Sequence, residues 1–525
     1  MLIALIIAIT LFSATPAAAE PVSGLIGLTA LITSFGVAAE TAAVVGGTIV
    51  AFGASLALNA ASTVLAKTQQ KKALRSAQAS LTAGVASEVQ GFRVPTRGSS
   101  TVREIVFGEV LKSGPVFFDE IKGPYWYIGL VLAAHEIDSV EQIRVGNDVV
   151  VIDSNGLPVA SPYFDGTRYF FKISFRLGTD DQAIDPILAA DFPEVGSQFR
   201  QRGLATVVIK MYAGTTDSMQ DSVWGRESPN FLFLVRGKKL FNPRDPSQVS
   251  SDPSTWLYSA NAALALATWL TDADGGQQPW SNINLDYLRA AADICDEKVG
   301  RKDGSTESRY ICNGIVTTSD DPATVFDDLL LNMLGTVTDF NGQIGIVAGG
   351  RREAVRTLHD GSARGPLVGA MGRAFADEVT TVRASFVSPE REYEVSAGPV
   401  YKDTAKIAAL GEEKTLSVSL PFAGSVGQVQ RICKHLINRA SLGKTIDRTE
   451  DIEACLLVPT DVVQVWYGGD LDVLNGLYEI AIHRQDQRMD EFNLTLLEYD
   501  ADLLYGWNPA VDEQDWENPI YNEDA

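Results

Sequence analysis

Four histidines and four cysteines are the side chains of this sequence best suited to metal binding or nucleophilic chemistry. They are His135, His359, His435, His483, Cys295, Cys312, Cys433 and Cys455. Zinc and redox sites need such residues at short spacing, and none of these cysteines forms a C-x-x-C pair. The G-x-S-x-G, H-E-x-x-H and P-loop patterns are also absent. The sequence therefore predicts no catalytic residue, no metal site and no cofactor.

Two local arrangements most resemble a metal site or a reactive pair of side chains, and each has a structural interpretation. Cys433 and His435 are two positions apart on a predicted helix, so their side chains point in different directions and favour packing or surface roles. Asp272 and Asp274 look like the start of a calcium loop, but glycine and isoleucine replace later ligands. A capped turn is the better interpretation of these two aspartates. A disulfide between Cys295 and Cys312 is left open, with free buried thiols favoured.

Length and charge limit the kinds of protein that this sequence can encode. A chain of 525 residues is too long for one compact core, which predicts several domains. Its formal net charge is −23, from 66 acidic and 43 basic residues. Such a surface repels nucleic-acid phosphates, which disfavours tight binding. Weak repulsion would still suit a conduit through which DNA slides without sticking.

Residues 1–66 form an apolar N-terminal segment, predicted to be helical, whose only charged side chains are Glu20 and Glu40. Small residues within it could let helices approach closely, in a membrane or in the lumen of an assembly. These candidates are Gly47, Gly53, Ala57 and Ala61. Insertion into lipid and packing inside an oligomer fit equally well, because both environments select similar residues. A cleaved signal peptide is a weaker alternative, since no basic residue precedes the apolar run.

The remainder of the chain reads as a β-rich α+β protein with several domains. Residues 67–103 form a basic linker, and period-two alternation such as that of 169–177 predicts strands through 104–245. Capped amphipathic helices predict an α/β domain over 246–375. A second β-rich domain follows over 376–507, with a helix near 425–441, and residues 508–525 form an acidic tail.

Four residues are predicted to fix turns instead of contacting a partner. Gly237 and Pro243 would set the turn after a strand at 229–236. Asn341 and Gly342 would close a hairpin, since this dipeptide suits the backbone of a tight turn.

Several stretches in the same order resemble one known family. They are "VPTRGSSTVREIVFGEVLKSGPVFFDE" (94–120), "PNFLFLVRGKKLFNPR" (229–244), "YSANAALALATWLTD" (258–272), "INLDYLRAAADICDE" (283–297), "RYICNGIVTTSDDPATVFDDLLLNMLGTVTDFNGQIGIVAG" (309–349) and "LNGLYEIAIHRQDQRMDEFNLTLLEYDADLLY" (474–505). Together they are similar to the lambda-like tail-tip attachment protein J, the central baseplate hub of long-tailed phages. The resemblance spans roughly residues 94–507, and it depends on collinearity instead of any single motif.

The resemblance implies a virion protein at the tail tip, a homotrimer that closes the tail tube and opens for DNA ejection. It implies two β-barrel-like tube domains with short helices, and further hub domains outside them. Implied partners are the distal tail protein, other tail-tip proteins, the tape-measure protein C-terminus and a receptor-binding fibre. DNA would pass through without specific binding, and the N-terminal segment would interact with the host membrane or stay packed in the tail.

This sequence departs from that family in two places, which leaves other functions open. It stops at Ala525, without a long receptor-binding half, so the acidic tail would instead dock a separate fibre. The apolar N-terminus is an addition to the family pattern. An exported β-rich envelope protein with an N-terminal signal or anchor is the main alternative. A cell-wall hydrolase is a third, although no carboxylate pair can be assigned from spacing alone.

Overall fold

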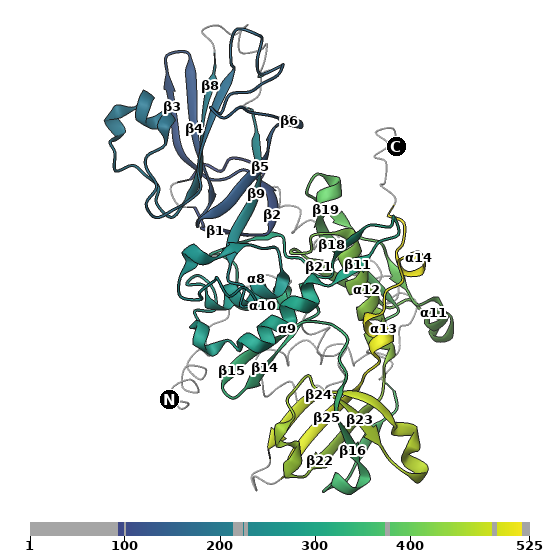
Figure 1. Cartoon of the computed structure of the whole chain (residues 1–525). Coiled ribbons are helices and arrows are strands. Elements are labelled where there is room, and N and C mark those ends of the chain that lie inside the picture. The colour runs from purple at the N-terminus through teal and green to yellow at the C-terminus, as the bar shows by residue number, and fades with distance from the viewer. Residues whose placement is uncertain are drawn as a thin grey trace, which may run out of the picture.

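The computed structural model describes residues 93–98, 101–213, 224, 229–372, 378–485 and 491–516. The predicted apolar segment 1–66, with Gly47, Gly53, Ala57 and Ala61, lies outside these residues. Figure 1 shows three domains along the length of the molecule, with a β domain at each end and the helices gathered between them.

The first domain consists of two sheets that share one core. One sheet has the strand order β3-β4-β8-β7, and the other has the order β10-β9-β5-β6, with β2 also paired to β9. Their bounds are β2 (Glu109–Lys112), β3 (Val116–Lys122), β4 (Tyr125–Ala133), β5 (Ile137–Val145), β6 (Asp148–Val150), β7 (Phe171–Arg176), β8 (Ala205–Tyr212), β9 (Phe231–Leu240) and β10 (Leu257–Tyr258). A short helix, α6 (Pro186–Asp191), packs beside β8.

Alternating side chains build the core of this domain. Phe171 and Ile173 of β7 point into it and Lys172 between them is exposed, as period-two alternation predicts. Strand β8 departs from strict alternation, because both of its faces are covered. Its Val207 and Ile209 pack in the core between the sheets, whereas Val208 packs with α6 on the other side.

A crossing of three strands joins the first domain to the rest. Strand β1 (Glu104–Phe107) pairs with β13 (Gly314–Thr317) of the next domain. At the crossing, a Cβ atom on Gly237 would lie only 2.1 Å from the carbonyl oxygen of Val106. Gly237 therefore lies inside β9, where its missing side chain lets two backbones approach, and not in a turn after the strand.

His135 closes the same junction from the β4 side. Its Nε2 accepts a hydrogen bond from the Val106 amide at 2.9 Å, so the proton is assigned to Nδ1, which contacts the Glu136 carbonyl at 2.7 Å. Burial, aided by the charge of Lys238, lowers the pKa of His135 to about 3. The folded protein therefore keeps this imidazole neutral.

The middle domain begins with three helices and short hairpins. They are α8 (Ala262–Thr271), α9 (Leu285–Asp296), α10 (Pro322–Asn332), β11 (Lys298–Gly300), β12 (Thr306–Ser308), β14 (Thr336–Phe340) and β15 (Gln343–Val347). Side chains of Asn261, Asn284 and Asp321 cap the three helices. Helix α8 is buried along most of its length, which explains its alanine and leucine content.

A later segment returns to complete this core. It contains β18 (Thr381–Ser388), β19 (Glu394–Ala397), β20 (Tyr401–Lys402), α11 (Thr404–Leu410), β21 (Thr415–Leu420) and α12 (Val426–Ser441). Residues from α8, α9, α10, β18 and α12 all belong to one hydrophobic cluster. The core therefore crosses the predicted division near residue 375.

The C-terminal domain is a six-stranded sheet built from two separate parts of the chain. Its strand order is β16-β23-β24-β25-β22-β17, and β16 is parallel to β23. Its bounds are β16 (Ala354–His359), β17 (Val368–Ala370), β22 (Thr445–Glu450), β23 (Val462–Trp466), β24 (Gly476–Gln485) and β25 (Phe492–Glu498). After it, α13 (Ala501–Tyr505) and α14 (Pro509–Asp512) carry the chain back to the middle domain.

The fold is β-rich, with several sheets and few helices, as the sequence predicts. The strand orders of the described sheets are open, so the barrel-like closure expected from the family resemblance is not present within this part of the chain. A sheet closes into a barrel only when its two edge strands pair with each other. Among the described helices, none has the length and apolar character required to span a membrane.

Replacement of Gly237 by alanine tests the strand crossing. The added methyl group would collide with the Val106 carbonyl, so we expect a loss of about 3 kcal/mol in unfolding free energy. Denaturant unfolding followed by tryptophan fluorescence measures this. Gly361→Ala is the matched control, because its Cβ would meet nothing within 4 Å, and should change stability by less than about 0.5 kcal/mol. Equal midpoints for the two variants would contradict the crossing.

The neutral state of His135 predicts a dependence of stability on pH. Its pKa of about 3 in the folded protein is below the ordinary value of 6.5, so the unfolded chain binds more protons between these values. The contribution is fully present above pH 6.5 and is lost as pH falls, by up to about 1.4 kcal/mol per pH unit. His135→Gln should flatten the plot of unfolding free energy against pH in this range, and an unchanged slope would contradict a neutral, buried His135.

Candidate functional site: the buried polar side chains of helix α12

The side chains best suited to metal binding or nucleophilic chemistry are dispersed through the described part of the chain. No group of three His, Cys, Asp or Glu side chains in this part of the chain is placed to hold a metal ion. Cys295, Cys312 and Cys433 are free and buried, and Cys455 is free and exposed. Burial raises the pKa of both Cys295 and Cys433 to about 12, so these thiols are not nucleophiles at neutral pH.

The predicted aspartate turn is held by charges from two other segments. Asp272 ends α8 and is paired with Lys238, and its Oδ1 accepts the Asp274 amide at 3.0 Å. Asp274 pairs with Arg103 at 3.2 Å. These carboxylates therefore bind the strand crossing to the helices.

The structure separates the residues predicted to fix turns. Pro243 is the second residue of a turn closed by the Asp245 amide, which donates to the Asn242 carbonyl at 3.1 Å. Asn341 and Gly342 join β14 to β15 and have φ values of 53° and 78°. Both φ values are positive, which is the backbone that an asparagine and glycine pair readily adopts. These positions lie apart from Gly237 and form no common site.

Helix α12 has a feature that the sequence did not reveal: five of its long polar side chains are buried. They are Gln428, Gln430, Arg431, His435 and Arg439. Ser425 caps the helix, since its hydroxyl accepts the Gln428 amide, and the apolar residues Val429, Ile432 and Leu436 enter the middle core. Buried polar groups must find partners or lose stability, so each of these side chains fixes another segment.

The N-terminal turn of α12 is fixed to α10. The side-chain amide of Gln428 donates to Asn332 Oδ1 at 2.9 Å and to the Ile311 carbonyl at 3.0 Å. Asn332 in turn donates to the Ile311 carbonyl at 2.8 Å. These bonds join α12, α10 and the segment leading to β13.

The next turn holds the β11 and β12 hairpin. Arg431 donates to Glu307 at 2.5 Å and to the carbonyl of Arg309 at 2.8 Å. Arg309 is itself paired with Glu297 at 2.7 Å. Burial lowers the pKa of Arg431, against the opposing charge of Glu307, so this pair is a costly one to break.

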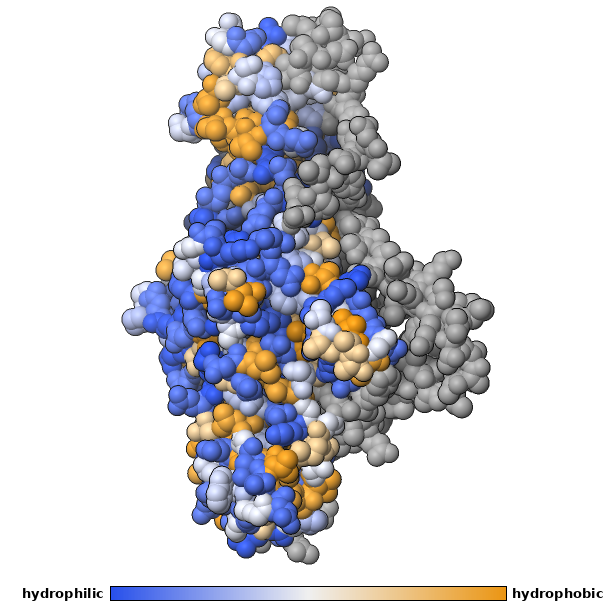
Figure 2. Space-filling model, turned by 90° about the vertical axis from the view of Figure 1, so that its right-hand side faces the viewer, coloured by the Kyte–Doolittle hydropathy of each residue, from blue (hydrophilic) through white to orange (hydrophobic). Residues whose placement is uncertain are grey.

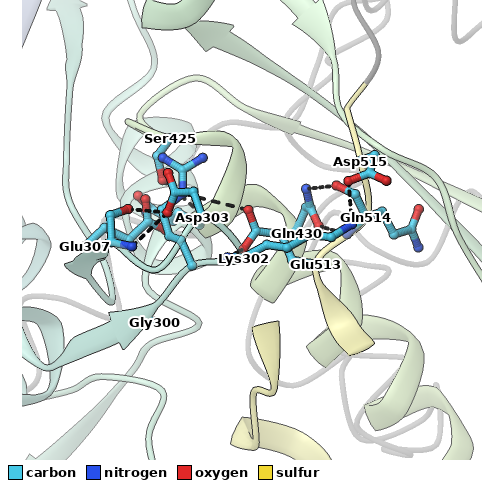
Figure 3. Close-up of polar contacts among 12 residues, drawn as sticks. Gly300, Lys302, Asp303, Glu307, Ser425, Gln430, Glu513, Gln514 and Asp515 are labelled. Carbon is cyan, nitrogen blue, oxygen red and sulfur yellow. Dashed lines mark hydrogen bonds and ion pairs between the residues drawn. The ribbon is translucent and has the colours of Figure 1, made fainter. Parts of the chain in front are cut away.

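Gln430 binds the end of the described chain, residues 506–516, which we call the C-terminal strap. Its side chain makes two bonds with the backbone of Gln514, at 2.8 and 3.1 Å, in the manner of a strand pair. Figure 3 shows Glu513, Gln514 and Asp515 alongside Lys302 and Gln430. Part of the predicted acidic tail therefore lies on the middle domain.

Charge complementarity holds the C-terminal strap in place. Its acidic residues Asp512 and Asp515 pair with Lys434 at 2.7 Å and Lys302 at 2.5 Å. Glu513 accepts the Lys302 amide at 2.7 Å. The strap thus places its carboxylates on basic residues of α12 and the β11 and β12 hairpin.

Trp516 anchors the far end of the C-terminal strap. Its indole N–H donates to the Ala397 carbonyl at 3.0 Å, and its ring packs 5.6 Å from that of Phe386. The guanidinium of Arg391 lies 3.8 Å from the ring centroid. An aromatic ring held by a hydrogen bond, a ring contact and a cation is a specific anchor.

The C-terminal turns of α12 hold the last domain. Arg439 donates to the Glu498 carbonyl at 2.5 Å, and its other nitrogen lies 4.0 Å from Glu479. Arg352, in the chain leading to β16, pairs with Glu479 at 2.7 Å. Burial works to raise the pKa of Glu479, but both guanidiniums outweigh it and hold the pKa below its usual range.

His435 joins the same group from α12 to α13. Its Nδ1 lies 3.2 Å from the Leu504 carbonyl and its ring 5.0 Å from that of Tyr505. Burial and the charge of Arg439 lower the pKa of His435 to about 4. Cys433 points elsewhere, into the core, so the two residues form no local pair, as their spacing predicts.

A separate hairpin fixes the first domain to the middle one. Between β18 and β19, Glu392 and Tyr393 have φ values of 56° and 61°, which are unusual for residues with side chains. Tyr393 is buried with Leu111 and Leu232 of the first domain, and its hydroxyl donates to Glu109 at 2.9 Å. Backbone strain of this kind persists only where the surrounding contacts require it.

Part of the chain is similar to a family of phage tail proteins. Residues 344–473 match a family model, Phage-tail_3, described as "Putative phage tail protein". This range includes α12 and most of the C-terminal sheet. No curated protein matches the sequence.

One of the matching solved structures shares the fold at low sequence identity. A chain of the "Virion of native gene transfer agent (GTA) particle" has a TM-score of 0.53 and 16% identity, over 81% of this chain and 89% of that one. A tail protein from Neisseria meningitidis MC58 covers 78% of this chain and 98% of its own, and a 43 kDa tail protein of prophage MuSo2 from Shewanella oneidensis covers 77% and 100%. Both have 10% identity and TM-scores of 0.28, too low to carry an argument. Residues 344–473 are thus similar to a phage tail family and the fold is similar to that of a chain of the gene transfer agent virion, whereas the resemblance to the J family stays a prediction.

Proposed function

We propose that this chain is a structural virion protein, the trimeric hub at the tip of a phage-type tail, which closes the tail tube and opens for DNA ejection. The observation that carries the proposal is the match of residues 344–473 to a phage tail family, within a fold shared with a chain of a gene transfer agent virion. The partners proposed for it are the distal tail protein, other tail-tip proteins, the tape-measure protein C-terminus and a receptor-binding fibre.

The interdomain contacts suit a virion component that must keep its shape under mechanical load. Tyr393 fixes the first domain, and Arg439 with Glu479 fixes the last. Several independent joints restrict domain movement more than one flexible linker would. The role is therefore one of shape and assembly, in which no reaction is required.

The acidic surface suits the passage of DNA. The net charge of −23 would be tripled in a trimer, and such a surface would offer the phosphates of DNA few cations to bind. Basic side chains of the described residues are largely engaged by carboxylates, as in the pairs of Arg144 with Glu392 and Arg244 with Asp293. A lumen of this chemistry lets DNA move without specific binding.

The N-terminal segment 1–66 is proposed to serve the same entry process. Its apolar residues would be shielded by neighbouring chains in the tail, or would enter the host membrane after the tip opens. The acidic residues after Trp516 are proposed to bind a separate fibre.

The copy number in purified particles tests the proposed function directly. We expect three copies of this chain per particle, found at the end of the tail opposite the head, because a central hub closes a tube on a threefold axis. Quantitative mass spectrometry against the tube protein measures the number, and electron cryomicroscopy measures the position. A copy number of six or more, or recovery of the chain only from cell envelopes, would contradict it.

Loss of the Trp516 anchor should loosen the C-terminal strap. Trp516→Ala removes the indole bond and the ring contacts, which we estimate at about 2 kcal/mol of local stability, or roughly a 30-fold rise in amide exchange over 506–516. Hydrogen exchange with mass spectrometry measures it. Val511→Ala is the control within the strap, since that side chain is exposed, and it should leave exchange unchanged. Equal exchange in Trp516→Ala and wild type would show that the strap is held elsewhere.

A further inference from the structure

An exposed apolar strip lies on one face of the first domain. Val149, Val151 and Val159 have 55%, 65% and 53% of their surface exposed. Val149 and Val151 are two residues apart along one extended segment, so they share a face. The Val159 amide donates to the Val151 carbonyl at 3.1 Å, which places Val159 beside Val151. We call these three residues the valine strip.

The opposite face of the same hairpin is already buried. Val150 and Ile152 alternate with the valine strip residues and pack against the core between the two sheets. Hydrophobic residues on both faces are typical of a strand that is covered on both sides. Figure 2 shows, on the face it presents, that surface hydrophobic residues form separate patches among hydrophilic ones. A clustered set of exposed valines is therefore a local feature that requires an explanation.

The valine strip continues a face that is covered within the chain. Leu232 of β9, Arg144 of β5 and Val149 of β6 are directly opposite one another in the sheet, so their side chains lie in one row. At one end of this row, Leu232 is covered by Tyr393. In the middle, Arg144 pairs with Glu392 at 2.9 Å. The cover ends at Val149.

The described chain begins beside the uncovered end of that row. The carbonyl of Arg93 accepts the side chain of Asn230 at 2.9 Å, and the Asn230 carbonyl accepts the amide of Gly146, in the turn between β5 and β6. Arg93 also pairs with Glu394 at 3.3 Å, next to the hairpin that covers Leu232. Arg93, the first described residue, therefore lies close to the hairpin of β5 and β6 that carries Val149.

We propose that residues 81–92 of the same chain cover the valine strip and complete the outer face of this sheet. Their apolar side chains recur every three or four positions, the spacing of one helical face, at Leu81, Val85, Val89 and Phe92. Twelve residues reach about 18 Å even as a helix, and the strip is about 7 Å long and one strand spacing wide. This contact would fix residues 81–92 on the first domain, whatever the protein's role.

Cysteine cross-linking in the full chain tests this placement. Cys455, the exposed native cysteine of the described residues, is first replaced by serine. Val149→Cys is then combined in turn with Val85→Cys, Val89→Cys and Phe92→Cys, and each variant is mildly oxidised in an equal mixture of ¹⁴N- and ¹⁵N-labelled chains. We expect at least one variant to give a linked peptide in high yield, with both halves carrying the same isotope. Linked peptides of mixed isotope would show that a second copy covers the strip, and no linked peptide from any variant would overturn the proposal.

A second measurement tests the accessibility of position 149 without a cross-link. Val149→Cys should react with a maleimide at least tenfold more slowly than Val368→Cys, which is placed on β17 with 62% exposure and has no proposed cover. Adding Val85→Asp and Val89→Asp should restore the rate of Val149→Cys to that of the control. Equal rates in the starting pair of variants would contradict a covered strip, even if disulfides could be trapped.

Discussion

The physical constraint on which the structure depends is that helix α12 is buried while it carries long polar side chains. An unpaired amide or guanidinium in a core costs several kcal/mol in the worst case, so each one requires a partner with good geometry. The partners come from different segments: Gln428 binds α10, Gln430 binds the C-terminal strap and Arg439 binds the last sheet. The burial of one helix thereby sets the positions of the others.

This arrangement explains how a chain with discontinuous domains stays a single unit. The C-terminal sheet is formed from residues on both sides of the segment that carries α12, so the chain leaves the middle domain and returns to it twice. Arg352 lies at the first exit and α13 at the last return, and both contact the group around Glu479. Contacts therefore fix the chain where it passes between the middle and C-terminal domains. Such a protein can transmit force along its length, as the proposed tail hub must.

Much of the local structure could be predicted from sequence, because it depends on neighbours in the chain. The Asp321 cap with Pro322 predicts α10, and the inward Val429, Ile432 and Leu436 predict α12. The sequence predicts Gly237 in a turn, whereas it lies inside β9, because its role depends on a contact with Val106, which is distant in sequence. The polar contacts of α12 were missed for the same reason: nothing local shows that Gln428 or Arg439 is buried. The unusual number of long polar residues on an otherwise apolar helix was the one available signal.

The distance distribution between two spin labels tests the central claim most directly. One label is placed on Cys455 of the C-terminal domain, which is exposed, and the other on Asp286→Cys of α9, also exposed. Electron–electron double resonance should give one narrow distance in the otherwise unchanged chain. Arg439→Met, which keeps the side-chain length but removes the bond to Glu498, should broaden it. A distribution that is already broad before the substitution, or stays narrow after it, would contradict the role assigned to α12.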